Sequence, residues 1–465
     1  MFSAAEAARM CGGKLIAGSP EARVTARAGV TIDSRGVAPG GLFVAVQGTR
    51  DGHDFVPDAV AAGAAAVLVS RPLPASATGS AAVIRADDTV AALQNLAREW
   101  RRRFSVPVAA ITGSVGKTTT KEMLRAILST DGHPHVTAGN LNNHLGLPLT
   151  LLGLRPEHDA CVVELGINHA GEMDLLTGIA LPTLGLVTAV GEAHLEGLGD
   201  RTGVAREKGR LFAAVARDGV TVINLDDALV RDEAARHHPA RRITYSATGV
   251  SGADVEARLE AAAQGPWLTL RIAGDEHSLG FFSAAAHQAC NAAAATAMAH
   301  AMGVKPARIA AGLAAFTPPP MRGGERETPA GVRVIDDTYN ANPASMLAAV
   351  RALVAHSGFG RRIAVLGDML ELGARGEELH RELGREVARL APDRLICTGP
   401  LSRHMAEGAN ALADVRIAAD APAAARHLDD LQAGDVVLVK GSRGMRMEQV
   451  VAALGVAGQN GKVHA

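Results

Sequence analysis

The chain has 465 residues, enough for roughly three domains and for large apolar cores that need no disulfide bonds. Its net charge of −1, its 3% of aromatic residues and the lack of a basic block argue against a nucleic-acid-binding surface. The four cysteines lie far apart, no apolar run reaches the roughly 18 residues of a membrane helix, and no signal-peptide pattern opens the chain. We therefore expect a cytoplasmic protein with reduced thiols and no membrane insertion.

The first region, residues 1–105, shows a small α/β pattern of short apolar runs and amphipathic segments. The predicted strands and helices are Leu42–Val46, Ala66–Val69, Val56–Ala65 and Thr89–Phe104. The last helix ends in Arg101-Arg102-Arg103, which we expect to be a solvated helix end near the negative pole of the helix dipole.

The second region, residues 106–316, alternates predicted strands with helical segments. The strands are Val108–Ile111, Ala160–Glu164, Leu184–Val190 and Val220–Asn224. Such alternation predicts a mainly parallel sheet that is covered by helices on both faces, with ligands beyond the carboxyl ends of the strands. Glu164 lies at one such end, and His194 follows another.

The segment Val108–Glu122, VAAITGSVGKTTTKE, has the strand–turn–helix layout of a phosphate-binding loop. Backbone N–H groups of the turn and the helix N-terminus would point at one spot and attract a phosphate. Lys117 would neutralise the outer phosphates, and the Thr118 hydroxyl would bind Mg²⁺. The usual pattern has a further glycine where this chain has Ile111, but the context still fits. We predict that a nucleoside triphosphate binds Gly113, Ser114, Val115, Gly116, Lys117, Thr118 and Thr119.

A run of three prolines, Pro318-Pro319-Pro320, predicts a hinge before the third region, residues 317–465. This region shows a second α/β pattern and ends in a tail, 458–465, that we expect to be frayed. Its predicted strands are Arg333–Asp336, Arg362–Leu366, Arg394–Cys397 and Val436–Lys440.

Single polar residues outside the phosphate loop carry weaker signals. Glu164 could hold Mg²⁺ or simply cap a loop. Taken alone, His194 is more typical of a loop histidine, Lys208 of a surface lysine, and Asp337 and Asn340 of turn residues.

Several ordered motifs together resemble the Mur ligases, the ATP-dependent amide-forming enzymes of peptidoglycan assembly. These motifs follow one another over nearly the whole chain, and DDTYNANPASM and VLGDMLELG are the most specific of them. They are TIDSRGVAPGGLFVAVQG with DGHDF (Thr31–Phe55), TGSVGKTTTKE (Thr112–Glu122), GNLNNHLGLPLTLL (Gly139–Leu152), ELGINHAGEM (Glu164–Met173), AHLEGLGDRTGVAREKG (Ala193–Gly209), DDTYNANPASM (Asp336–Met346), VLGDMLELG (Val365–Gly373) and KGSRGMRME (Lys440–Glu448).

The resemblance implies an α/β protein of three domains. A central P-loop ATPase domain with a parallel sheet (106–316) would lie between an N-terminal UDP-binding α/β domain (1–105) and a C-terminal Rossmann-like α/β domain (317–465) that binds the acceptor and closes. It also implies ADP-forming ligation of D-alanyl-D-alanine to UDP-N-acetylmuramoyl-tripeptide through an acyl phosphate. These two small molecules would be the partners, and a monomer is the favoured state, although the sequence does not fix it.

The resemblance further implies the catalytic and metal-binding residues. Lys117 would act on the phosphates, and Thr118 with Glu164 would hold one Mg²⁺. His194 and a carbamylated Lys208 would hold or orient a second Mg²⁺. A carbamate converts a cationic amine into an oxygen ligand, which suits a hard cation.

The remaining ATP contacts follow from the same resemblance. His287 and Asn291 would lie on the adenine side, and Asp337 would accept hydrogen bonds from the ribose, with Tyr339 and Asn340 beside it. The segment HQACN around His287 departs from the His-Asn of many relatives. Either Arg322 or Arg326 could reach the phosphates.

The other substrate would lie between the first two regions. The resemblance places Ser34, Arg35, Asp51 and His53 around the uridine diphosphate. It places Asn140, Asn142, Asn143 and His144, together with Asn168, along the sugar–peptide path. The third residue of the tripeptide is left open.

Two other functions stay open on the sequence. One is a related ligase, which adds the third peptide residue or glutamate to a folate. The other, of a different class, is a nucleotide-dependent switch that hydrolyses ATP without ligation. Phosphate release that needs both a UDP-linked tripeptide and a dipeptide would distinguish the proposed ligase from each.

Overall fold

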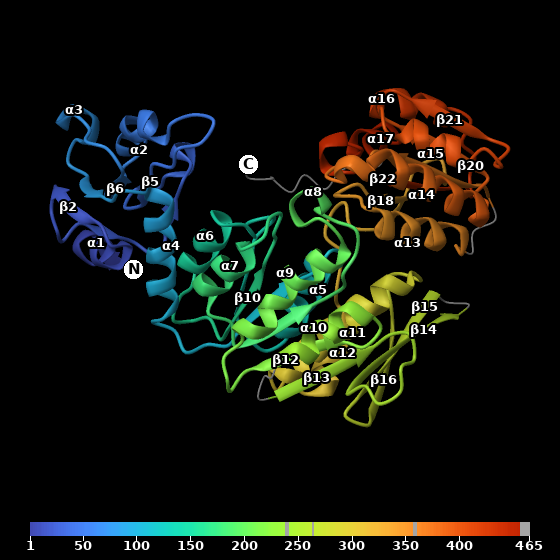
Figure 1. Cartoon of the computed structure of the whole chain (residues 1–465), viewed down its shortest axis with the longest axis horizontal. Coiled ribbons are helices and arrows are strands. Elements are labelled where there is room, and N and C mark those ends of the chain that lie inside the picture. Colours follow the sequence, from blue (N-terminus) through green and yellow to red (C-terminus); the bar gives the residue numbers. More distant parts are fainter. Residues whose placement is uncertain (238–240, 263–264, 357–359, 456–465) are drawn as a thin grey trace.

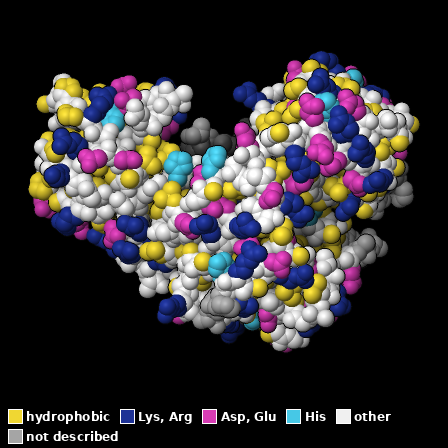
Figure 2. All heavy atoms as spheres, viewed as in Figure 1, with side chains coloured by type: hydrophobic (Ala, Val, Ile, Leu, Met, Phe, Trp, Pro, Cys, Tyr) yellow, Lys and Arg dark blue, Asp and Glu magenta, His cyan; other side chains and the backbone are white. Residues whose placement is uncertain are grey.

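The chain folds around three large sheets, one in each of the predicted regions (Figure 1). The computed structural model describes residues 1–237, 241–262, 265–356 and 360–455. The tail 458–465 lies outside the described residues. The N-terminal and C-terminal lobes stand apart above the central one, and the space-filling view shows a hollow between them (Figure 2).

The N-terminal sheet has the order β2–β7–β6–β5–β4 and is parallel except for β2, which pairs antiparallel with β7. The predicted strand Ala66–Val69 is confirmed as β6, while β5 ends two residues before the predicted limit. The elements are β1 (Phe2–Ser3), α1 (Ala4–Cys11), β2 (Lys14–Ala17), β3 (Arg23–Val24), β4 (Val30–Thr31), η1 (Ser34–Gly36), β5 (Leu42–Val44), η2 (Gly52–Phe55), α2 (Val56–Ala61), β6 (Ala66–Val69), α3 (Ala75–Thr78), β7 (Ala82–Arg85) and α4 (Thr89–Arg101).

Helix α4 joins the first region to the second. The Asp88 carboxylate caps its N-terminus, and its apolar face, including Leu93 and Trp100, packs into a core shared with α6 and α7 of the central region. The prediction of a solvated Arg101 is wrong. Arg101 is buried and donates hydrogen bonds to the carbonyl oxygens of Ala180 and Phe104, because the helix end lies under the central region rather than in solvent.

The central sheet has the order β16–β15–β14–β13–β12–β11–β8–β10–β9. The seven described strands from β9, at one edge of the sheet, to β14 in this order are parallel, as predicted. The antiparallel strands β15 and β16 complete the other edge. The elements are β8 (Val108–Thr112), α5 (Lys117–Leu128), β9 (Pro134–Val136), α6 (Gly146–Leu152), β10 (Ala160–Glu164), α7 (Glu172–Ala180), β11 (Leu184–Val187), α8 (Leu195–Leu198), α9 (Arg201–Ala214), β12 (Val220–Asn224), α10 (Ala228–Arg236), β13 (Arg241–Ser246), β14 (Val255–Ala262), β15 (Gly265–Ile272), β16 (Asp275–Gly280), α11 (Ala286–Ala301) and α12 (Pro306–Ala314).

Helices cover both faces of this sheet, as its apolar strands require. Helices α5, α11 and α12 pack together on one core, and α7, α9 and α10 pack on the other side (Figure 1). In this sheet the sequence analysis missed the short strand β9 and the strands β13 to β16, in which exposed residues interrupt the apolar pattern.

The C-terminal sheet has the order β17–β18–β22–β19–β20–β21 and is parallel except for β17. No helix or strand includes Pro318-Pro319-Pro320, which lie between α12 and β17. The elements are β17 (Gly324–Glu327), β18 (Arg333–Asp337), α13 (Pro343–Val354), β19 (Arg362–Gly367), η3 (Gly373–Arg375), α14 (Gly376–Leu390), β20 (Arg394–Thr398), α15 (Ser402–Gly408), β21 (Val415–Ala418), α16 (Ala421–Ala425), η4 (Arg426–Leu428), β22 (Val436–Lys440), η5 (Arg443–Met445) and α17 (Glu448–Ala453).

A third apolar core crosses from the central region to the C-terminal one. Leu195 and Phe212 on the central side share it with Met346, Met369 and Leu372 on the other. In the part of the chain that is described, no helix has the length and apolar character needed to cross a membrane.

Candidate functional site

The phosphate loop, residues Gly113–Gly116, connects β8 to α5 at the carboxyl edge of the central sheet. Gly116 has a φ of 84°, and a side chain there would overlap the Asn291 amide, so both the backbone and the space require glycine. The Ser114 N–H donates to the carbonyl oxygen of Ala189, and the Thr188 hydroxyl donates to that of Val115. The loop is therefore held in shape by the neighbouring strand end.

Lys117 is the first residue of α5, and its ammonium donates to the Gly113 carbonyl oxygen at 2.7 Å. The Lys117 side chain is half-buried because it folds back over the loop. Burial lowers the pKa of the Lys117 ammonium; nearby Glu164 opposes this, and Arg322 adds to it. The Lys117 ammonium thus lies at the loop without an ion pair to a carboxylate among the described residues.

Thr118 joins the loop to two other groups. Its hydroxyl donates to Glu164 Oε2 at 2.9 Å and accepts from Arg322 Nη2 at 2.9 Å. The other carboxylate oxygen of Glu164 accepts from the Asn142 amide at 2.8 Å. Two oxygen donors, the Thr118 hydroxyl and the buried Glu164 carboxylate, thus lie side by side, which fits the preference of Mg²⁺ for one or two protein oxygens beside phosphate and water.

The structure also separates the two candidate arginines. The Arg322 guanidinium stacks 3.6 Å from the ring centre of Tyr339 and touches Thr118. Arg326 lies on β17 and pairs with Asp336 at 3.3 Å. Of the two arginines, Arg322 is the one with a described contact to Thr118, next to the phosphate loop.

Lys208 lies on α9 and is fully buried. Its Nζ has no hydrogen-bond partner among the described residues. Burial, with Lys117 nearby, holds the pKa of the Lys208 ammonium well below its usual range, and Glu207 only partly offsets this. The interpretation as a surface lysine is therefore wrong, and the buried amine is driven toward its neutral form.

His194 precedes α8 and has a left-handed backbone, with φ of 56°. Its Nδ1 lies 2.9 Å from Glu371 Oε2 of the C-terminal region. The loop that carries it is tied to the phosphate loop, since the Ser114 hydroxyl donates to the Gly191 carbonyl oxygen. The described residues contain no cluster of three or more His, Cys, Asp and Glu that could hold a metal, so any metal here would rely on hydroxyl, phosphate or carbamate oxygens as well.

The predicted nucleoside contacts lie where the central and C-terminal regions meet. Asn291 on α11 donates to Gln288 and lies against the phosphate loop. Burial lowers the pKa of His287, an effect that nearby Asp337 opposes. Asp337 accepts from the buried Lys440 ammonium at 2.7 Å, and that ammonium also donates to the Asn340 carbonyl oxygen.

The predicted uridine-side residues form two separate groups on the N-terminal lobe. Ser34 and Arg35 lie in η1, where Arg35 is exposed and pairs with Asp33. Asp51 lies 2.6 Å from the Nδ1 of the buried His53, whose Nε2 accepts from the Ser70 N–H. These pairs hold the side chains, but the structure does not bring the two groups together through a described contact.

The predicted sugar–peptide residues are only partly assembled. Asn142 contacts Glu164, and the Asn143 side chain accepts from the backbone of Leu145 and Gly146. A cavity of about 240 Å³ is lined by Asn143, His144, Gly166, Asn168, His169, Glu172 and Leu176. Asn140, exposed in the same loop, does not line it.

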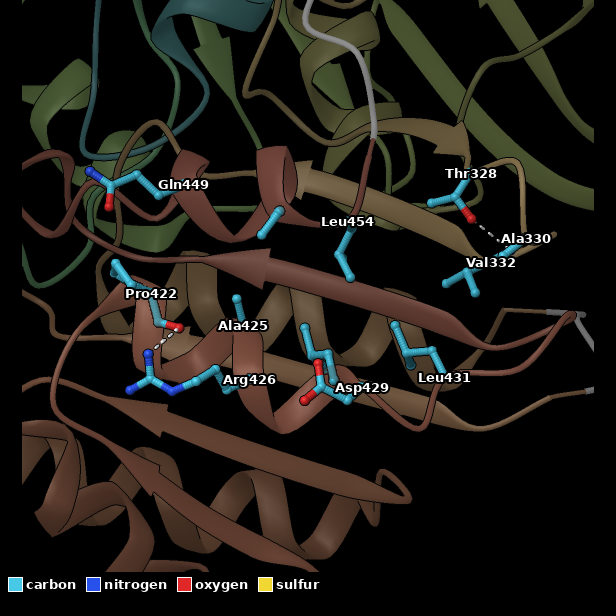
Figure 3. A pocket seen from close by; sticks show the side chains of 12 residues that line it. Thr328, Ala330, Val332, Pro422, Ala425, Arg426, Asp429, Leu431, Gln449 and Leu454 are labelled. Atoms are coloured by element: carbon cyan, nitrogen blue, oxygen red, sulfur yellow. Dashed lines mark hydrogen bonds between the residues drawn. The ribbon is translucent and has the colours of Figure 1, made fainter.

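A larger cavity of about 550 Å³ lies elsewhere, on the C-terminal sheet beneath α16 and α17 (Figure 3). None of the predicted site residues lines it. It is bordered by apolar side chains such as Val332, Leu428 and Leu431.

Sequence reasoning missed two residues beside the site. Lys121 is fully buried, donates to the Thr137 carbonyl oxygen at 2.7 Å, and lies 4.0 Å from Glu164 Oε2. Its position one helical turn after Thr118 was a signal for a shared face. Glu371 lies within the motif VLGDMLELG, but nothing in the sequence indicated that it contacts His194, which belongs to another region of the chain.

Comparison with known proteins agrees with this geometry. Three family models match: the Mur ligase family catalytic domain over residues 28–101, the Mur ligase middle domain over 111–299, and the Mur ligase glutamate ligase domain over 322–443. The chain belongs to the Mur ligase family.

Relatives match over nearly the full length. The UDP-N-acetylmuramoyl-tripeptide–D-alanyl-D-alanine ligase of Bacillus subtilis is 35% identical over 93% of this chain and 94% of its own. That of Escherichia coli is 38% identical over 91% and 93%. Among solved structures, MurF from Acinetobacter baumannii superposes with a TM-score of 0.86 at 33% identity, over 97% of this chain and 98% of its own. MurF ligase from Thermotoga maritima, in complex with ADP, gives 0.80 at 29% identity, over 92% and 97%.

Proposed function

We propose that this chain joins D-alanyl-D-alanine to UDP-N-acetylmuramoyl-tripeptide at the expense of ATP, a step of peptidoglycan precursor synthesis. The observation that carries the proposal is a phosphate loop with two cations, Lys117 and Arg322, that form no ion pair among the described residues, in a chain similar over nearly its whole length to ligases with that printed activity.

The chemistry has to activate a poor acyl donor. A carboxylate oxygen of the tripeptide attacks the γ-phosphorus of ATP, the bond to the ADP oxygen breaks, and an acyl phosphate forms. The amine of D-alanyl-D-alanine then attacks the acyl carbon. The tetrahedral intermediate expels phosphate, and the amine gives up a proton to leave the amide. The protein must bring anions together, orient them and exclude water.

The residues at the loop suit the first of these tasks. Lys117 and Arg322 would bind the phosphate oxygens, and the N-terminus of α5 would add its backbone N–H groups. Thr118 and Glu164 would hold Mg²⁺, which supplies positive charge against the phosphoryl group when bound. Asp337, Asn340, His287 and Asn291 would hold the nucleoside.

The three regions would divide the remaining work. We assign residues 1–105 to the uridine diphosphate end, through Ser34, Arg35, Asp51 and His53. Residues 106–316 would bind ATP and, through Asn140, Asn142, Asn143 and Asn168, the sugar and peptide. Residues 317–465 would bind the acceptor and close over the site.

Lys208 would act as a carbamate rather than as an amine. A buried amine that is driven toward its neutral form is a nucleophile: its nitrogen attacks CO₂, loses one proton and becomes an N-carboxylate. The product places an anion beside Lys117 and supplies oxygen ligands that His194 could share with a second Mg²⁺.

The carbamate can be tested with Lys208→Ala. We expect this variant to be nearly inactive and to regain part of its turnover with acetate or propionate, which can enter the space left by the side chain. In the unliganded wild type, a carbon-13 carbamate signal should appear with labelled bicarbonate and be absent from the variant. Near-normal turnover without added acid would contradict the role.

The ligase activity itself is tested by phosphate release. We expect release from ATP only when UDP-N-acetylmuramoyl-tripeptide and D-alanyl-D-alanine are both present, with one amide formed per phosphate. Release that responds to a single amino acid instead of the dipeptide would favour a ligase for another residue. Release that needs neither substrate would favour a nucleotide switch.

A further inference from the structure

A loop of the C-terminal region lies against the proposed catalytic histidine. The segment 368–375, between β19 and α14, contacts the loop 191–197 that leads into α8 (Figure 1). Two charged pairs cross this contact: His194 Nδ1 lies 2.9 Å from Glu371 Oε2, and Arg375 Nη1 lies 3.1 Å from Glu192 Oε1. Leu195 and Leu372 are buried beside them in the shared core.

Both members of the first pair have an unfavourable backbone. His194 has φ of 56° and Glu371 has φ of 63°, in the left-handed region that most residues other than glycine avoid. Glycine or asparagine would relieve this strain. The backbone alone therefore does not explain histidine at one position and glutamate at the other, and the contact between their side chains does.

Two backbone N–H groups of the loop that carries Glu371 are hydrogen-bonded to side chains of the C-terminal region. The Met369 N–H donates to Nε2 of the buried His380 at 3.0 Å, and the Leu370 N–H donates to the Ser442 hydroxyl at 2.8 Å. The Nδ1 of His380 lies 2.6 Å from the Gly376 carbonyl oxygen and so carries the proton, which leaves Nε2 as the acceptor. These hydrogen bonds fix the backbone next to Glu371, although the Glu371 side chain itself is 62% exposed.

We propose that Glu371 is a positioning residue that orients the imidazole of His194 across the domain interface. His194 Nδ1 lies 2.9 Å from the Glu371 carboxylate without the alignment of a hydrogen bond. A rotation of the imidazole that aligns its Nδ1–H with the carboxylate would fix the ring and leave Nε2 as the free nitrogen. Carboxylates commonly orient functional histidines in this way. The inference rests on the proposed function for the role of His194. Its consequence is that the histidine is fixed only when the C-terminal region is docked on the central one.

The test compares three variants in the full-length protein. Glu371→Ala removes the acceptor, Glu371→Gln keeps a neutral acceptor oxygen, and Arg375→Ala removes the neighbouring interdomain pair without touching His194. We expect Glu371→Ala to lower kcat about tenfold or more, with KM for ATP within about twofold of the wild type. Glu371→Gln should regain part of kcat, and Arg375→Ala should stay within about twofold. Because Glu371 is exposed, Tm should change little.

A second readout does not depend on turnover. In the unliganded protein with nitrogen-15-labelled histidine, the His194 resonances should show the proton on Nδ1, and Glu371→Ala should shift them toward a mixture of tautomers. Unchanged His194 resonances, or equal loss of kcat in Glu371→Ala and Arg375→Ala, would overturn the inference. If the wild type fails to ligate the dipeptide, the proposed function fails, while the resonances still decide whether Glu371 orients His194.

Discussion

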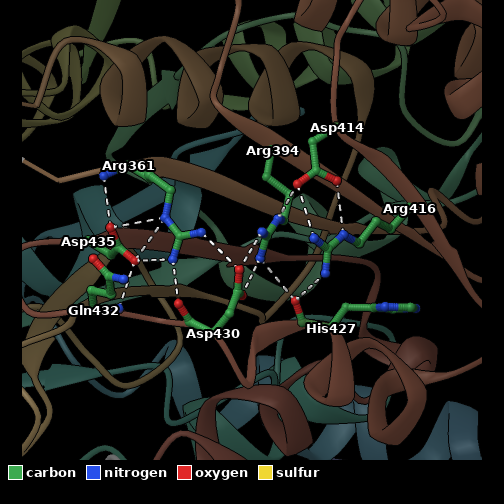
Figure 4. A network of polar contacts seen from close by, with 8 residues as sticks. All are labelled: Arg361, Arg394, Asp414, Arg416, His427, Asp430, Gln432 and Asp435. Atoms are coloured by element: carbon green, nitrogen blue, oxygen red, sulfur yellow. Dashed lines mark hydrogen bonds and ion pairs between the residues drawn. The ribbon is translucent and has the colours of Figure 1, made fainter.

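Two clusters of charged side chains in this molecule are built in opposite ways. At the phosphate loop, Lys117 and Arg322 form no ion pair with a carboxylate within the described residues, and the Lys208 amine has no hydrogen-bond partner there. On the C-terminal sheet, each arginine of a second cluster meets aspartates (Figure 4). Its members are Arg361, Arg394, Asp414, Arg416, Asp430 and Asp435. The cations of the first cluster are not paired with carboxylates, whereas each arginine of the second cluster already is.

The acid–base behaviour of the two clusters differs accordingly. Burial lowers the pKa of Lys117 and of Lys208, which means that the folded chain disfavours the charged forms of both amines. Hydrogen bonds to Asp430 and Asp414 raise the pKa of Arg394, and those to Asp435 and Asp430 raise that of Arg361. We infer that the first cluster is arranged for anionic ligands and the second for the stability of the fold.

The largest expected effect is a loss of activity without a loss of stability in a variant of the first cluster. Lys117→Ala removes a cation that neutralises transferring phosphate, and such contacts are worth on the order of 10² to 10⁵ in rate. Since a lysine with a lowered pKa costs the folded state free energy, Tm should not fall. Phosphate release and thermal unfolding measure the two effects.

The exposed Lys14→Ala serves as the control and should leave both quantities unchanged. Turnover near the wild-type value in Lys117→Ala would show that the phosphate-loop assignment is wrong. A large loss of Tm would instead place Lys117 with the paired, structural charges, and the contrast between the clusters would fail.

Much of the fold could be predicted because its central strands are buried on both faces. The runs Ala160–Glu164, Val220–Asn224 and Val436–Lys440 are continuous apolar segments and became β10, β12 and β22 without change. In contrast, β16, DEHSLG, has mostly exposed polar residues, and only pairing with β15 makes it a strand. A local pattern does not contain that pairing.

Contacts between distant parts of the sequence limit the prediction of the site in the same way. Lys117 and Thr118 were found because the phosphate loop is continuous in sequence. The choice between Arg322 and Arg326 could not be made, since it depends on how the segment after the prolines returns to Thr118. The burial of Lys208 and Arg101 was also out of reach, because helix packing decides which face of a helix is covered.

A variant of the second cluster should show the reverse of the Lys117→Ala result, with a loss of stability and little change in activity. Arg394 is only 5% exposed and donates to Asp414 and Asp430, so Arg394→Ala leaves Asp430 with Arg361 alone and Asp414 with Arg416 alone. Because both aspartates are partly exposed, we expect a loss of about 2 kcal/mol in urea unfolding of the C-terminal region. Activity per folded molecule, measured at low temperature, should stay close to the wild type.

Arg416→Ala is the matched comparison, since Arg416 shares Asp414 but is one-third exposed. It should cost less than about 1 kcal/mol. Equal losses from the two variants would mean that burial of Arg394 does not set the strength of the network.

The smallest effect is a pH dependence that tests whether the second cluster stabilises through charge. Hydrogen bonds from Arg394 and then Arg361 hold the pKa of Asp430 below its ordinary value, so the folded chain binds a proton less readily than the unfolded chain. This stabilisation is fully present above the unfolded-state pKa of about 3.9 and is lost as the pH falls below it toward the folded-state pKa. Asp430→Asn should therefore have a lower Tm than the wild type at pH 7, and the difference should close from about pH 4 downward.

Asp429→Asn, which changes the neighbouring exposed aspartate, should show no such difference at any pH. If the Tm difference for Asp430→Asn is the same at pH 7 and at pH 3, the cluster acts through shape and hydrogen bonding that the amide retains, and the electrostatic contrast with the phosphate loop does not hold.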